Sequence, residues 1–148
     1  GLVPAGLGAR DSLRLEVGYA LYGNDLDEEH TTLESGLGWV TKLDKGDFVG
    51  RDALAAQKEA GVERRLVGLR LTGKGFPRPG YDIRNGDDVV GVVTSGTVSP
   101  TLGYGIALGY VPTELAAVGT ELENDARGRP GDAVVQRPPF YNEGSIRR

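Results

Sequence analysis

Residues 81–94 read Tyr-Asp-Ile-Arg-Asn-Gly-Asp-Asp-Val-Val-Gly-Val-Val-Thr. Two segments with strand-forming residues, Tyr81 to Arg84 and Val89 to Thr94, flank the pair Asn85-Gly86. An Asn-Gly pair between such segments is typical of a tight hairpin with a type I′ turn, in which both central residues have positive φ. The stretch therefore predicts two neighbouring antiparallel strands, and β-structure for this part of the chain.

Further strands are predicted on both sides of this hairpin. Leu66 to Leu71 alternates as a half-buried strand does, and strands are also predicted over 105–111, 120–126 and 132–136. The chain has 24 glycines and 8 prolines, which suits many short strands joined by tight turns. Residues 63–148 are therefore expected to form a small antiparallel barrel or a Greek-key sandwich. Asn124-Asp125-Ala126 interrupts the apolar alternation, which indicates a frayed or edge position there.

The first 62 residues mix helix and strand signals in a piece too short to enclose its own core. A short helix is predicted over 8–16 with Gly18 as its stop, and a better one over 52–59, which is rich in alanine and followed by Gly61. Thr31 and Glu34 have the spacing of a capping box. A strand is predicted over 39–43. The expected fold class is α+β, with a partial mixed α/β segment over 1–62 and a self-contained β-domain over 63–148.

Composition limits the possible partners and sites. The 148 residues carry a net charge of −4 and no conspicuous basic run, so nucleic acid and anionic membranes are poor candidate partners. The absence of cysteine excludes disulfides and thiolate metal sites. With no apolar run of membrane-spanning length and no signal-like N-terminus, the chain is expected to be cytoplasmic. No metal is expected, since it has no cysteine and one histidine. Because it begins at Gly1 and contains no methionine, we expect it to be part of a larger protein.

Several conspicuous residues have a plain structural interpretation. His30 is the only histidine, so a multi-histidine metal site is excluded, and its position beside an acidic run favours a structural role. The run 25–29 is expected to be a solvated loop, because it lacks the glycine of a calcium-binding loop. The loop 94–103 is rich in Ser, Thr and Gly but lacks the lysine and spacing of a phosphate-binding loop. Four aromatic residues can stack on a flat ligand, but such residues more often belong to the core: Tyr22, Trp39, Phe140 and Tyr141.

Several motifs, taken in order, resemble the glycine cleavage T-protein (aminomethyltransferase) family. They are Gly-Leu-Gly-Ala-Arg-Asp-Ser-Leu-Arg-Leu-Glu (6–16), Leu-Tyr-Gly-Asn-Asp (21–25), Gly-Leu-Gly-Trp (36–39), Asp-Phe-Val-Gly-Arg (47–51), Thr-Ser-Gly-Thr-Val-Ser-Pro-Thr-Leu-Gly (94–103), Pro-Phe-Tyr (139–141) and Gly-Ser-Ile-Arg-Arg (144–148). The resemblance covers essentially the whole chain. It implies that 1–62 is the C-terminal piece of a folate-binding aminomethyltransferase core and that 63–148 is the C-terminal barrel of a T-protein.

The resemblance also implies a reaction and its participants. In this family tetrahydrofolate, a co-substrate, attacks an aminomethyl group carried on the lipoyl arm of a small carrier protein, the H-protein. Ammonia leaves, and methylene-tetrahydrofolate and the dihydrolipoyl carrier remain. Two alternatives stay open: a folate-dependent demethylase or oxidoreductase domain of the same fold, and a non-catalytic binding module.

Three residues are expected at the folate site on the basis of this resemblance. Glu16 matches the acidic residue that binds the pterin, and a carboxylate suits the two parallel N–H groups of that edge. Lys45 is taken as the basic folate contact, with Lys42 as the other candidate, and Arg148 matches a residue that contacts the carboxylate-bearing tail. The family's catalytic aspartate lies in a region that these 148 residues do not contain. The chain alone is therefore expected to have no aminomethyltransferase activity.

Overall fold

The computed structural model describes residues 1–144 of the chain. Two helices precede a set of β-strands, as the sequence predicts. The elements are α1 (Leu7–Glu16), α2 (Arg51–Ala60), β1 (Arg64–Leu71), β2 (Asp82–Asn85), β3 (Asp88–Val98), β4 (Gly105–Pro112), the short 3-10 helix η1 (Thr113–Leu115), β5 (Glu121–Asp125) and β6 (Pro130–Val135).

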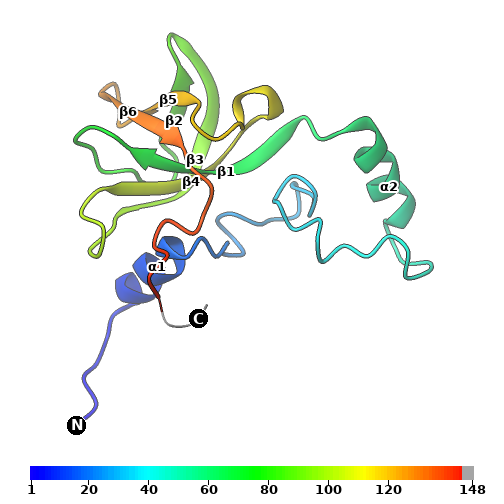
Figure 1. The fold of residues 1–148 in the computed structure, drawn as a ribbon, viewed down its shortest axis with the longest axis horizontal. Coiled ribbons are helices and arrows are strands. Elements are labelled where there is room, and N and C mark those ends of the chain that lie inside the picture. Colours follow the sequence, from blue (N-terminus) through cyan, green and yellow to red (C-terminus); the bar gives the residue numbers. More distant parts are fainter. Residues whose placement is uncertain (145–148) are drawn as a thin grey trace.

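The six strands close into an antiparallel barrel in the order β1-β4-β3-β2-β5-β6 (Figure 1). Strands β2, β3 and β4 form a meander, and β1 lies beside β4, which is the arrangement of a Greek key. The last strand returns to the first, where Leu69 of β1 pairs with Val135 of β6. The expected small antiparallel barrel is therefore confirmed.

The hairpin at 81–94 forms with a turn one residue later than the Asn-Gly signal placed it. Asn85 pairs with Asp88, so the two central residues of the turn are Gly86 and Asp87. Gly86 has φ +62°. Asp87 does not have a positive φ, since Arg127 is the one non-glycine residue within 1–144 that does. Positive φ at the first central residue alone is the pattern of a type II′ turn. The type I′ prediction was wrong, although the hairpin itself was right.

Apolar side chains from all six strands fill the inside of the barrel. The buried cluster consists of Val67, Leu69, Ile83, Val93, Ala107, Val111, Leu122 and Val135. Alternate residues of each strand point inward, as the two-residue period of a strand requires. This interior supplies the main hydrophobic core of the described chain.

Strand β4 is buried on both faces, and its outer face fixes the position of α1. Its sequence, Gly-Ile-Ala-Leu-Gly-Tyr-Val-Pro, is an almost continuous apolar run. On the outer face, Ile106 and Leu108 form a second buried cluster with Leu15 of α1 and Phe140 of the C-terminal segment. The helix end and the C-terminal segment therefore cover the barrel together (Figure 1).

Helix α1 ends in a tight turn at Gly18. The N–H groups of Gly18 and Tyr19 donate to the carbonyls of Leu15 and Arg14, both at 2.9 Å, which is a Schellman motif. Gly18 has φ +75°, and a Cβ at this residue would overlap the ring of Pro138. The stop predicted at Gly18 is thus required both by the backbone turn and by the close approach of the C-terminal segment.

The segment between the helices contains turns where a strand was predicted. Residues 38–40 form a turn, and no strand lies over 39–43, so that prediction was wrong. The capping-box prediction was right in its contacts. The Thr31 N–H donates to the Glu34 carboxylate at 2.8 Å, and the Glu34 N–H donates to the Thr31 hydroxyl at 3.3 Å. These contacts stabilise a single turn that does not continue as a helix.

Strand β5 ends at Asp125 and pairs on both sides up to that residue, which contradicts the frayed or edge position predicted for 124–126 at its first two residues. Asn124 lies opposite Ile83 of β2 and Gly131 of β6 and is 1% exposed. Asp125, the next residue, forms an ion pair with Arg84 at 3.1 Å. In a closed barrel every strand has two neighbours, so a polar residue in a strand does not mark an edge.

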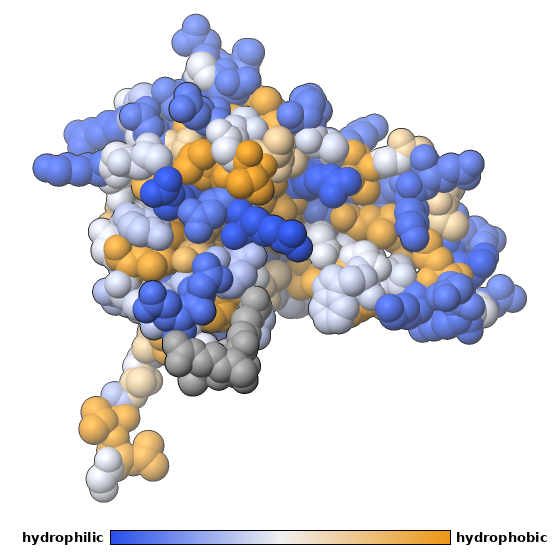
Figure 2. Space-filling model, in the orientation of Figure 1, coloured by the Kyte–Doolittle hydropathy of each residue, from blue (hydrophilic) through white to orange (hydrophobic). Residues whose placement is uncertain are grey.

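Exposed apolar side chains are concentrated in the first 62 residues. Nine of the thirteen large exposed apolar residues within 1–144 lie there: Leu2, Val3, Leu7, Leu13, Tyr19, Tyr22, Trp39, Val40 and Val49. The apolar N-terminal tail projects from the body of the molecule (Figure 2). By contrast, Leu15 is the one residue of this segment in the buried apolar core. Within 1–144, no helix is both long and apolar enough to cross a membrane.

Candidate functional site

The last turn of α1 lies against β3 and the loop that follows it, and carries two charged residues, Arg14 and Glu16, that bind the strand and the loop respectively. Both are held by hydroxyl groups of the segment 94–101, which the sequence singled out as a loop. Residues 94–98 belong to β3, and the loop that follows connects β3 to β4. The candidate site is built on this junction between helix and barrel.

The Glu16 carboxylate is held by the β3–β4 loop. Its Oε1 accepts hydrogen bonds from the Ser99 hydroxyl at 2.5 Å and the Thr101 N–H at 3.2 Å, and its Oε2 accepts one from the Thr101 hydroxyl at 3.0 Å. The Leu102 N–H in turn donates to the Ser99 hydroxyl at 2.9 Å, which orients that hydroxyl. Glu16 is only 3% exposed, but Thr101, whose hydroxyl donates to Oε2, lies at the surface.

The backbone of Glu16 is fixed from the other side by the C-terminal segment. The N–H groups of Phe140 and Tyr141 both donate to the Glu16 carbonyl at 2.9 Å. Phe140 is 4% exposed and belongs to the core, whereas Tyr141 is half-buried. The residue predicted to bind the pterin is therefore held at its carboxylate and at its carbonyl.

Arg14 uses all five of its N–H groups. They donate to the Asp11 carboxylate twice, to the carbonyl of Tyr19 at 3.1 Å, to the Asp25 carboxylate at 2.6 Å and to the Ser95 hydroxyl at 2.7 Å. A guanidinium has exactly five such donors in a planar fork, so none is left unsatisfied. Arg14 thereby joins α1, the turn after it and β3.

Asp25 is fully buried, so the expectation of a solvated loop over 25–29 was wrong at this residue. Its Oδ2 accepts from Arg14 and from the Leu21 N–H at 2.9 Å, and its Oδ1 accepts from the Thr94 hydroxyl at 2.5 Å. The hydroxyl of Tyr110 also donates to the Asp25 carbonyl at 2.9 Å. Asp27, Glu28 and Glu29 are exposed, as expected.

His30 and Tyr110 form a stacked pair beside this network. Their ring centroids lie 3.8 Å apart with an interplanar angle of 12°. The Nδ1 of His30 lies 2.9 Å from each carboxylate oxygen of Asp27, and this side-chain hydrogen bond is the main cause that lowers the pKa of Asp27. Burial raises the pKa of Tyr110, opposed in part by its hydrogen bond with Ser35. His30 bonds a carboxylate and no hydroxyl nucleophile within 1–144.

The basic residues expected at the folate site do not lie beside Glu16. Lys42 and Lys45 are exposed, and the Lys45 ammonium lies 4.9 Å above the ring of Phe48. Their loop runs beside α2, well away from α1 (Figure 1). Arg51 ties this loop to α2, because its Nε–H donates to the Leu43 carbonyl at 2.8 Å. The structure brings Glu16 together with Ser99 and Thr101, and with neither lysine.

Arg148, the third expected folate contact, lies outside the described residues. Of the four aromatic candidates, Phe140 belongs to the core and Tyr141 is half-buried. Tyr22 and Trp39 are exposed at 69% and 72%. These two rings are therefore free to contact a ligand or another part of a protein.

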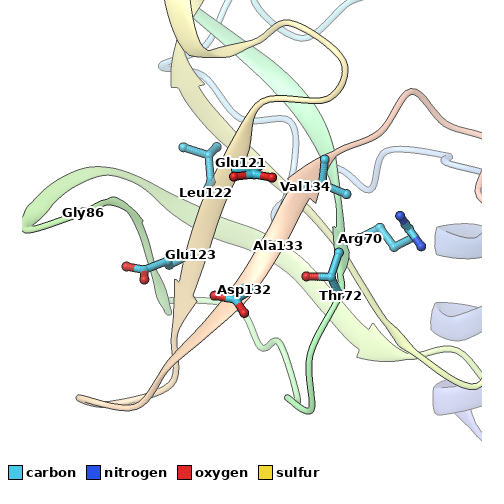
Figure 3. A pocket seen from close by; sticks show the side chains of 9 residues that line it. All are labelled: Arg70, Thr72, Gly86, Glu121, Leu122, Glu123, Asp132, Ala133 and Val134. Carbon is cyan, nitrogen blue, oxygen red and sulfur yellow. The ribbon is translucent and has the colours of Figure 1, made fainter.

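A sizeable hollow lies elsewhere, on the outside of the barrel. It encloses about 610 Å³ and is lined by Arg70, Thr72, Gly86, Glu121, Leu122, Glu123, Asp132, Ala133 and Val134. Figure 3 shows that its carboxylates come from the adjacent strands β5 and β6, while Arg70 points away from them. It contains none of the predicted site residues. No group of three His, Cys, Asp or Glu side chains within 1–144 is arranged to bind a metal ion.

Reasoning from the sequence missed Arg14, Asp25, Ser99 and Thr101 as members of one site. Asp25 could not be distinguished from its acidic neighbours in the sequence, and its partners Arg14 and Thr94 are 11 and 69 positions away. A signal was present, since both Arg14 and Asp25 lie within motifs that carry the family resemblance. Chemically, the site offers a carboxylate held by neutral hydroxyl donors, which suits recognition of N–H groups on a ligand.

Comparison with known proteins places both parts of the chain in one family. The family model described as the glycine cleavage T-protein C-terminal barrel domain matches residues 64–142, and the GCVT N-terminal domain matches residues 1–45. An aminomethyltransferase of Nostoc sp. is 55% identical over 146 residues, covering 98% of this chain and 39% of that protein. An aminomethyltransferase of Synechocystis sp. is 56% identical over 142 residues, covering 95% of this chain and 38% of that protein.

A solved structure shows the same arrangement. The glycine cleavage system aminomethyltransferase T of Bartonella henselae superposes with a TM-score of 0.86 at 36% identity, covering 92% of this chain and 39% of that chain. The chain thus spans about two fifths of the length of each relative that it matches.

Proposed function

The chain belongs to the glycine cleavage T-protein family, and we propose on that basis that it forms part of a tetrahydrofolate-dependent aminomethyltransferase. The observation that carries the proposal is the match of two family models in the same order along one chain, over 1–45 and 64–142. Both halves of the chain point to the same kind of protein. The reaction takes an aminomethyl group from a lipoyl carrier protein to tetrahydrofolate and releases ammonia, in the cytoplasm.

The proposal divides the chain at 62/63. Residues 63–148 form the C-terminal barrel domain, and residues 1–62 are a piece of the folate-binding core. The distribution of apolar residues supports this division, because 1–62 contributes one residue, Leu15, to the buried apolar core and exposes nine large apolar side chains. Such a concentration of exposed apolar surface is typical of a surface that packs on another part of a protein. For these side chains other than Tyr22, the occupant that we propose is the remainder of the aminomethyltransferase core present in the longer relatives.

Glu16 is the proposed pterin contact. Its Oε2 accepts one hydrogen bond, from the exposed Thr101, and a carboxylate oxygen has a second lone pair for a ligand N–H. Ser99 and Thr101 fix the rotamer of the carboxylate before a ligand arrives, which lowers the entropic cost of binding. Lys45 and Arg148 remain the proposed contacts of the folate carboxylates. Since Lys45 lies away from Glu16, its participation requires a ligand of folate length or a different placement of its loop in the complete enzyme.

The test of the reaction uses the full-length protein that contains this chain. We expect it to release ammonia from an aminomethyl-lipoyl carrier protein only when tetrahydrofolate is present, and to form methylene-tetrahydrofolate. The 148-residue chain alone should be inactive. If the full-length protein instead demethylates a methylamine substrate and leaves the loaded carrier unchanged, the aminomethyltransferase proposal is wrong. The demethylase alternative then replaces it.

The test of Glu16 compares two buried glutamates. In the full-length protein, Glu16→Gln should weaken tetrahydrofolate binding about 10- to 100-fold, the equivalent of about 1.5–3 kcal/mol for hydrogen bonds to a charged group. The matched control is Glu34→Gln, since Glu34 is also buried and also holds a turn through Thr31. This control should leave affinity unchanged. If both variants lower thermal stability alike and neither changes affinity, Glu16 is purely structural.

A further inference from the structure

The turn that follows α1 is closed from within by Asp25. The Leu21 carbonyl accepts from the N–H groups of Asn24, Asp25 and Leu26 at 3.1, 2.8 and 3.2 Å. The Leu21 N–H in turn donates to the Asp25 carboxylate at 2.9 Å. Each end of this short turn is therefore tied to the other by both main-chain and side-chain hydrogen bonds, which leaves its backbone little freedom.

The same carboxylate anchors the turn to the rest of the molecule. Arg14 of α1 and Thr94 of β3 both donate to the Asp25 side chain, and Tyr110 of β4 donates to its carbonyl. The Asp25 side chain is completely buried, and that of Arg14 is 10% exposed. Buried charge-assisted hydrogen bonds of this kind hold groups in one geometry more firmly than exposed ones do.

Tyr22 lies on this rigid turn and points its ring into solvent. It is 69% exposed, and its hydroxyl has no hydrogen-bond partner among residues 1–144. A large aromatic side chain on a fixed backbone has few rotamers to lose on binding, so it makes contacts at low entropic cost.

We propose that Tyr22 is a further ligand-contacting residue, whose ring stacks on a flat ring of tetrahydrofolate, and that Asp25 is the positioning residue that holds it there. This inference rests on the proposed function. The turn and the Glu16 carboxylate are anchored on one strand and the loop that follows it, at Thr94 and Ser99. Arg14, which binds Asp25, precedes Glu16 by two residues in the last turn of α1. One rigid frame therefore carries both the polar contact and the aromatic face.

Trp39 is the competing exposed ring, and its surroundings differ. It is 72% exposed in the turn 38–40, beside a hollow of about 320 Å³ that Gln57, Lys58 and Arg65 also line. Among residues 1–144, no buried side chain links that turn by a hydrogen bond to α1 or to the β3–β4 loop that holds Glu16. Trp39 thus lies beside α2, whereas the turn that carries Tyr22 is anchored to α1 and β3, close in sequence to the groups that hold Glu16.

The experiment measures the affinity of the full-length protein for tetrahydrofolate by calorimetry under anaerobic conditions, together with thermal unfolding of each variant. Tyr22→Ala should weaken binding about 5- to 100-fold, the range for stacking of flat bases on aromatic side chains, with an unchanged melting temperature. Tyr22→Phe should bind as the wild type does, because the ring face is kept. Asp25→Asn should lower both affinity and melting temperature.

The control for general destabilisation is Asp125→Asn, which breaks the ion pair with Arg84 on the side of the barrel away from α1. It should lower the melting temperature and leave affinity unchanged. If the wild type binds and Tyr22→Ala binds equally well, this inference is wrong while the proposed function stands. If Tyr22→Phe loses as much affinity for tetrahydrofolate as Tyr22→Ala does, stacking is the wrong interaction. If the wild type does not bind tetrahydrofolate, both the proposed function and this inference fail.

Discussion

Arg14 and Asp25 form an ion pair at 2.6 Å in which the aspartate side chain is completely buried, whereas Asp11, bound to the same guanidinium, keeps a side chain that is 45% exposed. One cation thus has two carboxylate partners in different environments. The exposed partner is screened by water and the buried one is not. The two ion pairs of Arg14 therefore allow a direct comparison of a buried and an exposed carboxylate within a single network.

We expect Asp25→Asn to lower the free energy of unfolding by about 3–5 kcal/mol, because it leaves the Arg14 charge without its buried partner. Asp11→Asn should lower it by only about 0–1 kcal/mol, as exposed pairs do. Urea denaturation of the 148-residue chain measures both values. Equal effects of the two substitutions would show that burial of Asp25 adds nothing to this pair.

Tyr110 predicts a loss of stability at alkaline pH. Burial raises its pKa above the ordinary value of 10.0, so the folded state favours the neutral phenol. A group with a raised folded pKa contributes stability that is complete below its unfolded pKa and is lost as pH rises through the folded pKa. The free energy of unfolding should therefore fall as pH increases beyond about 10.

The Tyr110→Phe variant tests this origin. It should remove the alkaline loss while lowering stability at neutral pH by about 1–3 kcal/mol, because the Ser35 hydroxyl and the Asp25 carbonyl lose their buried partner. Tyr22→Phe, at an exposed tyrosine, should leave the alkaline slope unchanged. The measurement is denaturant unfolding of both variants at a series of pH values, with phenolate absorbance followed in parallel. An unaltered slope in Tyr110→Phe would assign the alkaline loss to another group.

The same substitution at two glycines should have opposite effects. A Cβ at Gly68 of β1 would overlap the Gln136 carbonyl and lie 2.9 Å from the Phe140 ring, so Gly68→Ala should cost about 1–3 kcal/mol. Nothing lies within 4 Å of a Cβ at Gly8 in α1. Gly8→Ala should stabilise the chain by about 0.5–1 kcal/mol, because it reduces the freedom of the unfolded chain. Melting temperatures of the two variants should move in opposite directions, and a shared sign would contradict the packing at Gly68.

Phe140 fastens the C-terminal segment over α1. Phe140→Ala should cost about 3–5 kcal/mol, because a buried ring is lost from its cluster with Leu15, Ile106 and Leu108. Amide hydrogen exchange in α1 should accelerate at the same time, since the helix loses the segment that covers its end. Val118→Ala is the control, with a side chain that is 69% exposed, and should change neither quantity. Accelerated exchange in the barrel but not in α1 would contradict this role of Phe140.

The barrel could be predicted from the sequence because strand alternation and glycine-rich turns are local signals. All six strands and both helices lie close to their predicted positions, and Gly18 and Gly61 follow the two helices as expected. The prediction over 39–43 failed because strand-forming residues make a strand only where another strand can pair with them. Between Gly36 and Gly46 the chain turns repeatedly instead.

The site was less predictable because its contacts are long-range. Glu16 was selected through the family resemblance, but its bonds to Ser99 and Thr101 span more than 80 residues. Asp25 shares an acidic run with Asp27, Glu28 and Glu29, and composition alone cannot separate one buried carboxylate from three exposed ones. Asn124 is a similar case, since a polar residue in a strand indicated an edge and instead lies inside a closed sheet.

The return of β6 to β1 leaves the barrel without a strand whose main-chain N–H and C=O groups are free along one side. Another polypeptide therefore finds no strand that is open along its whole length, which disfavours extension of this sheet by strand addition. A protein that docks on the barrel is then expected to contact it mainly through side chains. The exposed apolar residues of the first 62 positions, rather than the strands, are the expected contact surface.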